Sequence, residues 1–249
     1  MDFNKVLEHH LLDHIVWPGF SIAGIAFPIT KHVIMMWIAA GGLILVLSFL
    51  ARSWSFVPSR VSHNLLEAFI VFVRDEVVVS NMGEEGKAYL PYFLTLFFFI
   101  LSINLLGLFP EAATASGNIS VTAGLAICTF LLINFAGIRK FGLFHHFKNF
   151  IPHGLPWWLV PLMLPLELVG LVTKSFALCI RLFANMIAGH VVILAFLSLI
   201  FLYGTVFVAP PSVAAAVGIN LLEVFVAFLQ AYIFTLLTAI FVGASLHPH

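Results

Sequence analysis

Long apolar runs divide this chain, and they constrain its fold more than any other feature of the sequence. A helix needs about 20 apolar residues to cross the hydrocarbon core of a bilayer. Only 9% of the 249 residues are charged, whereas an ordinary soluble domain carries about 25% charged residues. So few charges cannot cover a soluble surface. The sequence therefore predicts an all-α integral membrane protein, and its net charge of zero gives no indication of a nucleic-acid partner.

The apolar runs predict about five membrane helices in a single membrane domain that covers residues 1–249. An N-terminal segment, 1–32, precedes the first span. Charged residues interrupt the helical pattern of 61–80, so this stretch is expected to lie along the membrane interface as an amphipathic helix. The membrane helices are expected at 33–51, 90–109, 119–138, 157–203 and 212–246.

Lysine and arginine fall mainly on one side of the predicted membrane, which sets the orientation of the chain. If the spans alternate, the basic stretches at 52–87 and 139–148 share one side. The loops at 110–118 and 204–211 contain no lysine or arginine. The basic side is expected to be the cytoplasm or its matrix equivalent, with the N-terminus outside and the C-terminus inside.

The last two apolar stretches are too long for upright membrane helices. About 40 residues form roughly 60 Å of helix, against a hydrocarbon core of about 30 Å. These stretches are expected to form a strongly tilted hairpin that turns between Gly204 and Pro211. The alternative is a helix broken at Pro161, Pro165 or Gly189.

Polar side chains on this hairpin follow a helical spacing. Arg181 is the most informative, because a charge at bilayer depth costs roughly 2.5 to 3.5 kcal/mol and arginine cannot lose its proton. The residues seven and fourteen positions before Arg181, and the residue four positions after it, lie on the same helix face as Arg181. These neighbours are Glu167, Lys174 and Asn185. His190, nine residues beyond Arg181, points about 180° away from it.

The final helix carries a matching set of polar residues. They are Asn220, Glu223 and Gln230. Folding the hairpin antiparallel about residue 207 brings His190 near Glu223 and Asn185 near Gln230. The first layer then holds a histidine beside a carboxylate, which can pass a proton near neutral pH. The second layer holds the arginine and two amides. The positive charge of the arginine attracts anions and repels protons. An interrupted proton path requires such an arrangement.

The block SFALCIRLFANMIAGH at 175–190 closely resembles subunit a of the membrane sector of F-type ATP synthases. Glu167 and Lys174 upstream, LQAYIFTLLTAIF downstream and NLLGLFP at 104–110 are similar to the same family. The resemblance covers nearly the whole chain. The histidine on the first long helix and the acid on the second are similar to mitochondrial and alphaproteobacterial members.

The resemblance implies a non-catalytic stator subunit with two offset proton half-channels at its interface with a rotating c-ring. Such a subunit couples the proton-motive force to ATP synthesis. Arg181 matches the arginine that faces the ring carboxylate, with Asn185 and Gln230 beside it, and His190 and Glu223 match the histidine–acid pair. Residues that could line the half-channels are Glu167, Lys174, Asn104, Glu111 and Asn220.

The resemblance also implies partners and a location. The partners are the c-ring, the peripheral-stalk b subunits and the remaining ATP synthase subunits, within a lipid bilayer. No cofactor or metal is implied. The location is a bacterial cell inner membrane, with the mitochondrial inner membrane as the alternative.

From the residues alone, structural roles and two other function classes stay open. Arg181 could pair with a carboxylate of this chain, Lys174 could extend toward the interface, and the amides could join helices. A stand-alone secondary ion transporter also places charges at the midplane, although it usually shows an internal repeat. A metalloenzyme could use the histidine clusters at 9–14 and 145–153, but these are predicted on opposite sides of the membrane.

Overall fold

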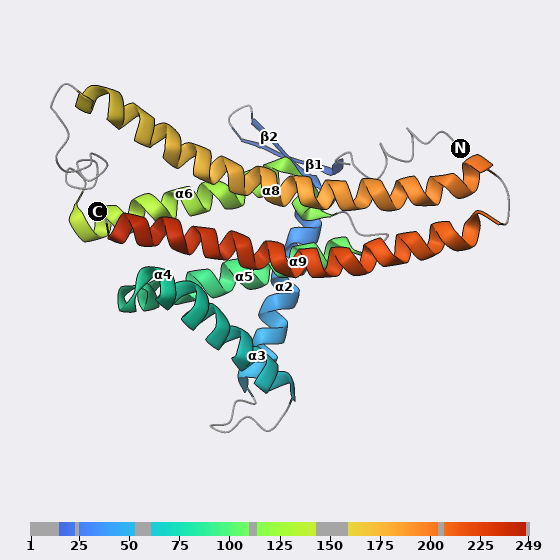
Figure 1. Ribbon diagram of the computed structural model, residues 1–249, viewed down its shortest axis with the longest axis horizontal. Coiled ribbons are helices and arrows are strands. Elements are labelled where there is room, and N and C mark those ends of the chain that lie inside the picture. The colour runs from blue at the N-terminus through green and yellow to red at the C-terminus, as the bar shows by residue number, and fades with distance from the viewer. Residues whose placement is uncertain are drawn as a thin grey trace. The chain divides into compact units, whose positions relative to one another are not determined.

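The computed structural model describes a chain that is mostly helical (Figure 1). The described residues are 15–22, 25–52, 61–109, 114–142, 159–203 and 207–247. In these ranges, five helices are long and apolar enough to cross a membrane, by length and composition. They are α2 (Lys31–Arg52), α5 (Leu90–Gly107), α6 (Ile119–Phe141), α8 (Val160–Tyr203) and α9 (Ala209–Leu246). The predicted all-α membrane class is therefore confirmed.

A shorter helical segment between α2 and α5 has one buried and one charged face. It consists of α3 (Val61–Phe72), a π-helix (Val73–Val79), α4 (Ser80–Met82) and a 3-10 helix (Glu84–Tyr89). Val77 and Val78 are fully buried. Beside them, Arg74 donates a hydrogen bond of 2.7 Å from Nε to Asp75, which holds the pKa of that carboxyl below its usual range. Residues 61–80 are thus helical, as predicted, and their position along the membrane interface stays a prediction.

A pair of short antiparallel strands precedes α2, and the sequence analysis did not predict it. β1 (Ile15–Ile22) pairs with β2 (Ile25–Thr30). Both strands are rich in β-branched and aromatic residues, which favour an extended backbone. The pairing is irregular on both sides of Trp17, next to Pro18, because a proline nitrogen cannot donate to a strand ladder. The strands lie within the segment 1–32, which the sequence analysis treated as undivided.

The described chain forms two compact units, and each of the long helices contributes one segment to each unit. Unit 1 comprises Met1–Ser48, Phe98–Thr122 and Arg181–Ala231, and unit 2 comprises Phe49–Phe97, Ala123–Ile180 and Tyr232–His249.

Unit 2 packs segments of α5, α6 and α9 through buried aromatic and hydroxyl side chains. The fully buried aromatic residues include Phe93, Phe97 and Phe234. The hydroxyl oxygens of Thr129 on α6 and Thr238 on α9 lie 3.5 Å apart. Gly243 of α9 approaches the Asn81 backbone so closely that a Cβ would collide with the Asn81 carbonyl. A glycine is therefore needed where α9 meets α4.

In unit 1, the segments of α8 and α9 run antiparallel and side by side (Figure 1). α8 is continuous from Val160 to Tyr203, so the alternative of a break at Pro161, Pro165 or Gly189 is wrong. Pro165 lies near the start of the helix, where its missing N–H removes a single backbone hydrogen bond. The 44 residues of α8 correspond to about 66 Å of helix. The strong tilt expected for such a length stays a prediction.

Candidate functional site

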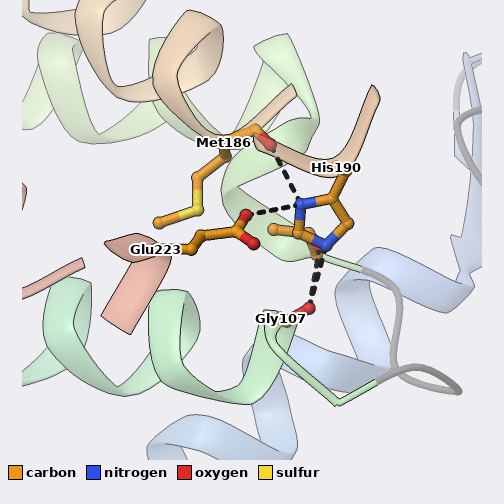
Figure 2. Close-up of polar contacts among 5 residues, drawn as sticks. Gly107, Met186, His190 and Glu223 are labelled. Carbon is orange, nitrogen blue, oxygen red and sulfur yellow. Dashed lines mark hydrogen bonds and ion pairs between the residues drawn. The ribbon is translucent and has the colours of Figure 1, made fainter. Parts of the chain in front are cut away.

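A histidine and a glutamate meet between α8 and α9 in unit 1 (Figure 2). His190 Nδ1 lies 2.8 Å from Glu223 Oε1. The side chain of Glu223 is only 4% exposed, and a buried carboxylate without a partner would be strongly destabilising. The close approach of His190 and Glu223, predicted from the antiparallel register, is confirmed.

Both ring nitrogens of His190 have further partners (Figure 2). Nδ1 lies 3.0 Å from the Met186 carbonyl oxygen, one turn earlier on α8. Nε2 lies 3.0 Å from the Gly107 carbonyl oxygen at the end of α5, and 2.8 Å from the hydroxyl of Thr114. Because Nδ1 faces two oxygen acceptors, a carboxylate and a carbonyl, it must carry a hydrogen while Glu223 is ionised.

Two glycines allow the groups around His190 to come together. A Cβ at position 189 would lie 2.6 Å from Glu223 Oε1, so Gly189 makes room for the carboxylate against α8. A Cβ at position 107 would lie 2.6 Å from Thr114 Cγ2, so Gly107 makes room for the threonine. The sequence analysis did not single out Gly107 or Thr114 as site residues. Gly107 lies within the NLLGLFP motif, which the sequence analysis did note. Thr114 lies in the following loop, where no helical periodicity marks it as a site residue.

A second polar layer lies further along the same two helices in unit 1. Asn185 Nδ2 donates to Gln230 Oε1 at 2.8 Å, which confirms that predicted pairing. Gln230 is 2% exposed, and its Nε2 has no hydrogen-bond partner among the described residues. Asn104 of α5 is fully buried and donates to the carbonyl oxygen of Ala227 at 3.4 Å. Asn104 therefore meets α9 at a residue between Glu223 and Gln230.

Arg181 stands at the start of the α8 segment in unit 1 and is partly exposed. Within the side chains that the structure describes, no carboxylate forms an ion pair with it. Glu223, one of the acids that could have neutralised it, is paired with His190 instead.

Of the remaining predicted residues, the structure describes the side chains of Lys174 and Asn220. Lys174 belongs to unit 2, where it is exposed and its Nζ lies 5.6 Å from the centroid of the Phe241 ring. Asn220 is exposed on α9. Glu111 and the side chain of Glu167 lie outside the described residues, as do the histidine clusters at 9–14 and 145–153.

The chain matches the family model described as ATP synthase A chain over residues 33–243. Three proteins named ATP synthase subunit a show the extent of the similarity. The Myxococcus xanthus protein is 48% identical over 238 residues, which cover 93% of this chain and 78% of the relative. The Anaeromyxobacter dehalogenans protein is 50% identical over 88% of this chain and 58% of the relative. The Chloroherpeton thalassium protein is 45% identical over 92% of this chain and 69% of the relative.

These relatives correct one detail of the sequence analysis. They are deltaproteobacterial and Chlorobi proteins, so the expected likeness to alphaproteobacterial members in particular is not supported.

Proposed function

The chain belongs to the ATP synthase subunit a family, and we propose that it conducts protons as the stator subunit of the F0 membrane sector. It does so without catalysing a reaction of its own. The contact of 2.8 Å between the partly exposed His190 and the buried Glu223 carries this proposal, because it puts two titratable groups between apolar helices. The Asn185–Gln230 layer lies beside it on the same helices.

The His190–Glu223 pair belongs to the outer half-channel. A proton that enters converts His190 into an imidazolium, and the neighbouring carboxylate stabilises that positive charge. The pair can therefore hold a proton at a depth where an isolated charge would be costly. We assign Asn104, Asn220 and Glu111 to the same half-channel.

Arg181 separates the outer from the inner half-channel. It is permanently charged, and its guanidinium forms no ion pair within the described part of the chain. It supplies the counter-charge that a carboxylate of the rotating c-ring needs when it loses its proton in an apolar setting. The same positive charge repels protons that would otherwise leak from one half-channel to the other.

The other polar residues extend these two functions. Asn185, one turn from Arg181 on α8, and its hydrogen-bond partner Gln230 stabilise the ring carboxylate through hydrogen bonds. We assign Glu167 and Lys174 to the inner half-channel, through which the proton leaves. The membrane potential contributes about 2.3 kcal/mol per elementary charge for every 100 mV.

The partners follow from membership of the F0 complex. They are the c-ring, the peripheral-stalk b subunits and the remaining ATP synthase subunits. The five candidate spans in the described residues support a multi-pass membrane protein. The bacterial origin of the relatives supports a location in a bacterial cell inner membrane.

Replacement of Arg181 tests the proposal in the intact complex. With Arg181→Ala, proton transport coupled to ATP synthesis should be abolished, while ATP hydrolysis by the catalytic head continues. Arg139→Ala is the matched control, because Arg139 is an exposed arginine in the last turn of α6. Proton-driven ATP synthesis at the wild-type rate in the Arg181→Ala complex would contradict the proposal.

A further inference from the structure

We propose that Thr114 is a positioning residue whose hydroxyl hydrogen-bonds His190 Nε2 in both protonation states of the histidine. This role rests on the proton-conducting function proposed above. The Thr114 hydroxyl oxygen lies 2.8 Å from Nε2 and 3.3 Å from the Gly107 carbonyl oxygen. A hydroxyl rotates freely to suit its neighbours. It can therefore direct its hydrogen to either of these two atoms.

The surroundings of His190 decide which nitrogen exchanges its proton. Nδ1 lies 3.0 Å from the Met186 carbonyl oxygen, which can accept its hydrogen bond, and forms an ion-pair contact of 2.8 Å with Glu223 Oε1. A bare Nδ1 would direct its lone pair at the carbonyl oxygen and would lie beside an ionised carboxylate. Nδ1 therefore keeps its hydrogen, and His190 takes up and releases a proton at Nε2.

Nε2 needs different partners in the two states. In neutral His190 it is an acceptor, and the Gly107 carbonyl at 3.0 Å offers it no hydrogen. The Thr114 hydroxyl is the group in contact with Nε2 that can donate to it. When a hydrated proton binds the Nε2 lone pair and leaves a water molecule behind, the new N–H donates to the Gly107 carbonyl and the Thr114 oxygen.

The hydroxyl hydrogen then turns from Nε2 to the Gly107 carbonyl oxygen, 3.3 Å away. When the proton leaves Nε2 for water, the hydroxyl turns back. No backbone movement is needed, and the hydrogen on Nδ1 stays in place throughout. Without the hydroxyl, the lone pair of neutral Nε2 would face only the Gly107 carbonyl, and His190 would release its proton less readily.

Two substitutions separate the hydroxyl from the packing of its side chain. Thr114→Val keeps the branched shape and removes the hydroxyl, whereas Thr114→Ser keeps the hydroxyl and removes the methyl group. Of the Thr114 atoms, the methyl carbon lies nearest to the position that a Cβ would take at Gly107. In the intact complex in liposomes, Thr114→Val should reduce ATP-driven proton pumping roughly tenfold, as expected for one lost buried hydrogen bond. Thr114→Ser should retain most of the pumping.

Nitrogen-15 spectra of histidine-labelled complex give a readout that does not depend on turnover. Subtraction of the His190→Gln spectrum assigns the signals of His190. Neutral His190 should show a protonated Nδ1 and a bare, hydrogen-bonded Nε2 in the wild type and in Thr114→Ser. The hydrogen-bond shift of Nε2 should be lost in Thr114→Val.

The proposal is overturned if wild-type neutral His190 carries its hydrogen on Nε2. It is also overturned if Thr114→Val pumps normally, or if Thr114→Ser is as defective as Thr114→Val, which would assign the effect to packing. The first point needs only the wild-type and His190→Gln complexes, so it is decided even if a Thr114 variant fails to assemble. Failure of the proposed function itself would be seen with Arg181→Ala, whatever the spectra of His190 show.

Discussion

Gly189→Ala should separate proton transport from folding. The added Cβ would lie 2.6 Å from Glu223 Oε1 and 2.9 Å from its Cδ. Ordinary van der Waals contact begins at 3.4 Å, so the carboxylate must move by about 0.8 Å. The atoms in the way are the far end of a flexible side chain. Glu223 can therefore yield for about 1 kcal/mol of rotamer strain, and the helix pair should still form.

The same movement should break the contact between Glu223 and His190. Their ion-pair distance of 2.8 Å would lengthen toward about 3.6 Å, which weakens the attraction between the imidazolium and the carboxylate. At an effective dielectric constant of about 20, this lengthening removes about 1.3 kcal/mol of that attraction. Because about 1.4 kcal/mol is a factor of ten in rate, proton transport should fall roughly tenfold.

The assay is ATP-driven proton pumping in liposomes that contain equal amounts of assembled complex. Gly218→Ala on α9 is the matched control, since a Cβ at that position would meet nothing within 4 Å. Both variants replace a helical glycine by alanine, so both gain the same helix propensity. Pumping at the wild-type rate in Gly189→Ala, with the complex fully assembled, would refute the inference that transport depends on the close contact between His190 and Glu223.

Two further experiments test the pair and the orientation of the chain. The double exchange His190→Glu with Glu223→His should retain more proton pumping than either single change, because it preserves a contact between an imidazole and a carboxylate; equal loss in all three variants would argue against a shared site. Cysteines introduced at Ser120 and His247, which are both exposed, should react with a membrane-impermeant thiol reagent from opposite sides of the membrane, and labelling of both from one side would disprove the predicted topology.

The sequence by itself determined the helices and their pairing in the site. Apolar length and helical periodicity are properties of a single segment, so the class of the protein and the extents of the long helices could be predicted. The contacts of His190 with Glu223 and of Asn185 with Gln230 could be predicted as well. Within each pair, the two residues lie about equally far from the turn in the sequence. An antiparallel hairpin brings such positions together.

The sequence did not predict the strands β1 and β2. Two prolines interrupt them, and their pairing is irregular. The alternating pattern of a regular strand is therefore weak in this segment, although its residues favour an extended backbone.

Only the tertiary structure showed what surrounds the pair. Thr114 and Gly107 reach His190 across 76 and 83 residues of sequence, and Asn104 reaches Ala227 across 123. Such contacts depend on how far one helix is rotated about its axis and shifted along it relative to another helix. The periodicity within a single helix does not specify either quantity. The need for glycine at 107 and 189 has the same origin, because the atoms that fill the space come from other segments. The pattern within each helix thus identified the acid and the histidine, and packing between segments decided which other groups hydrogen-bond to them.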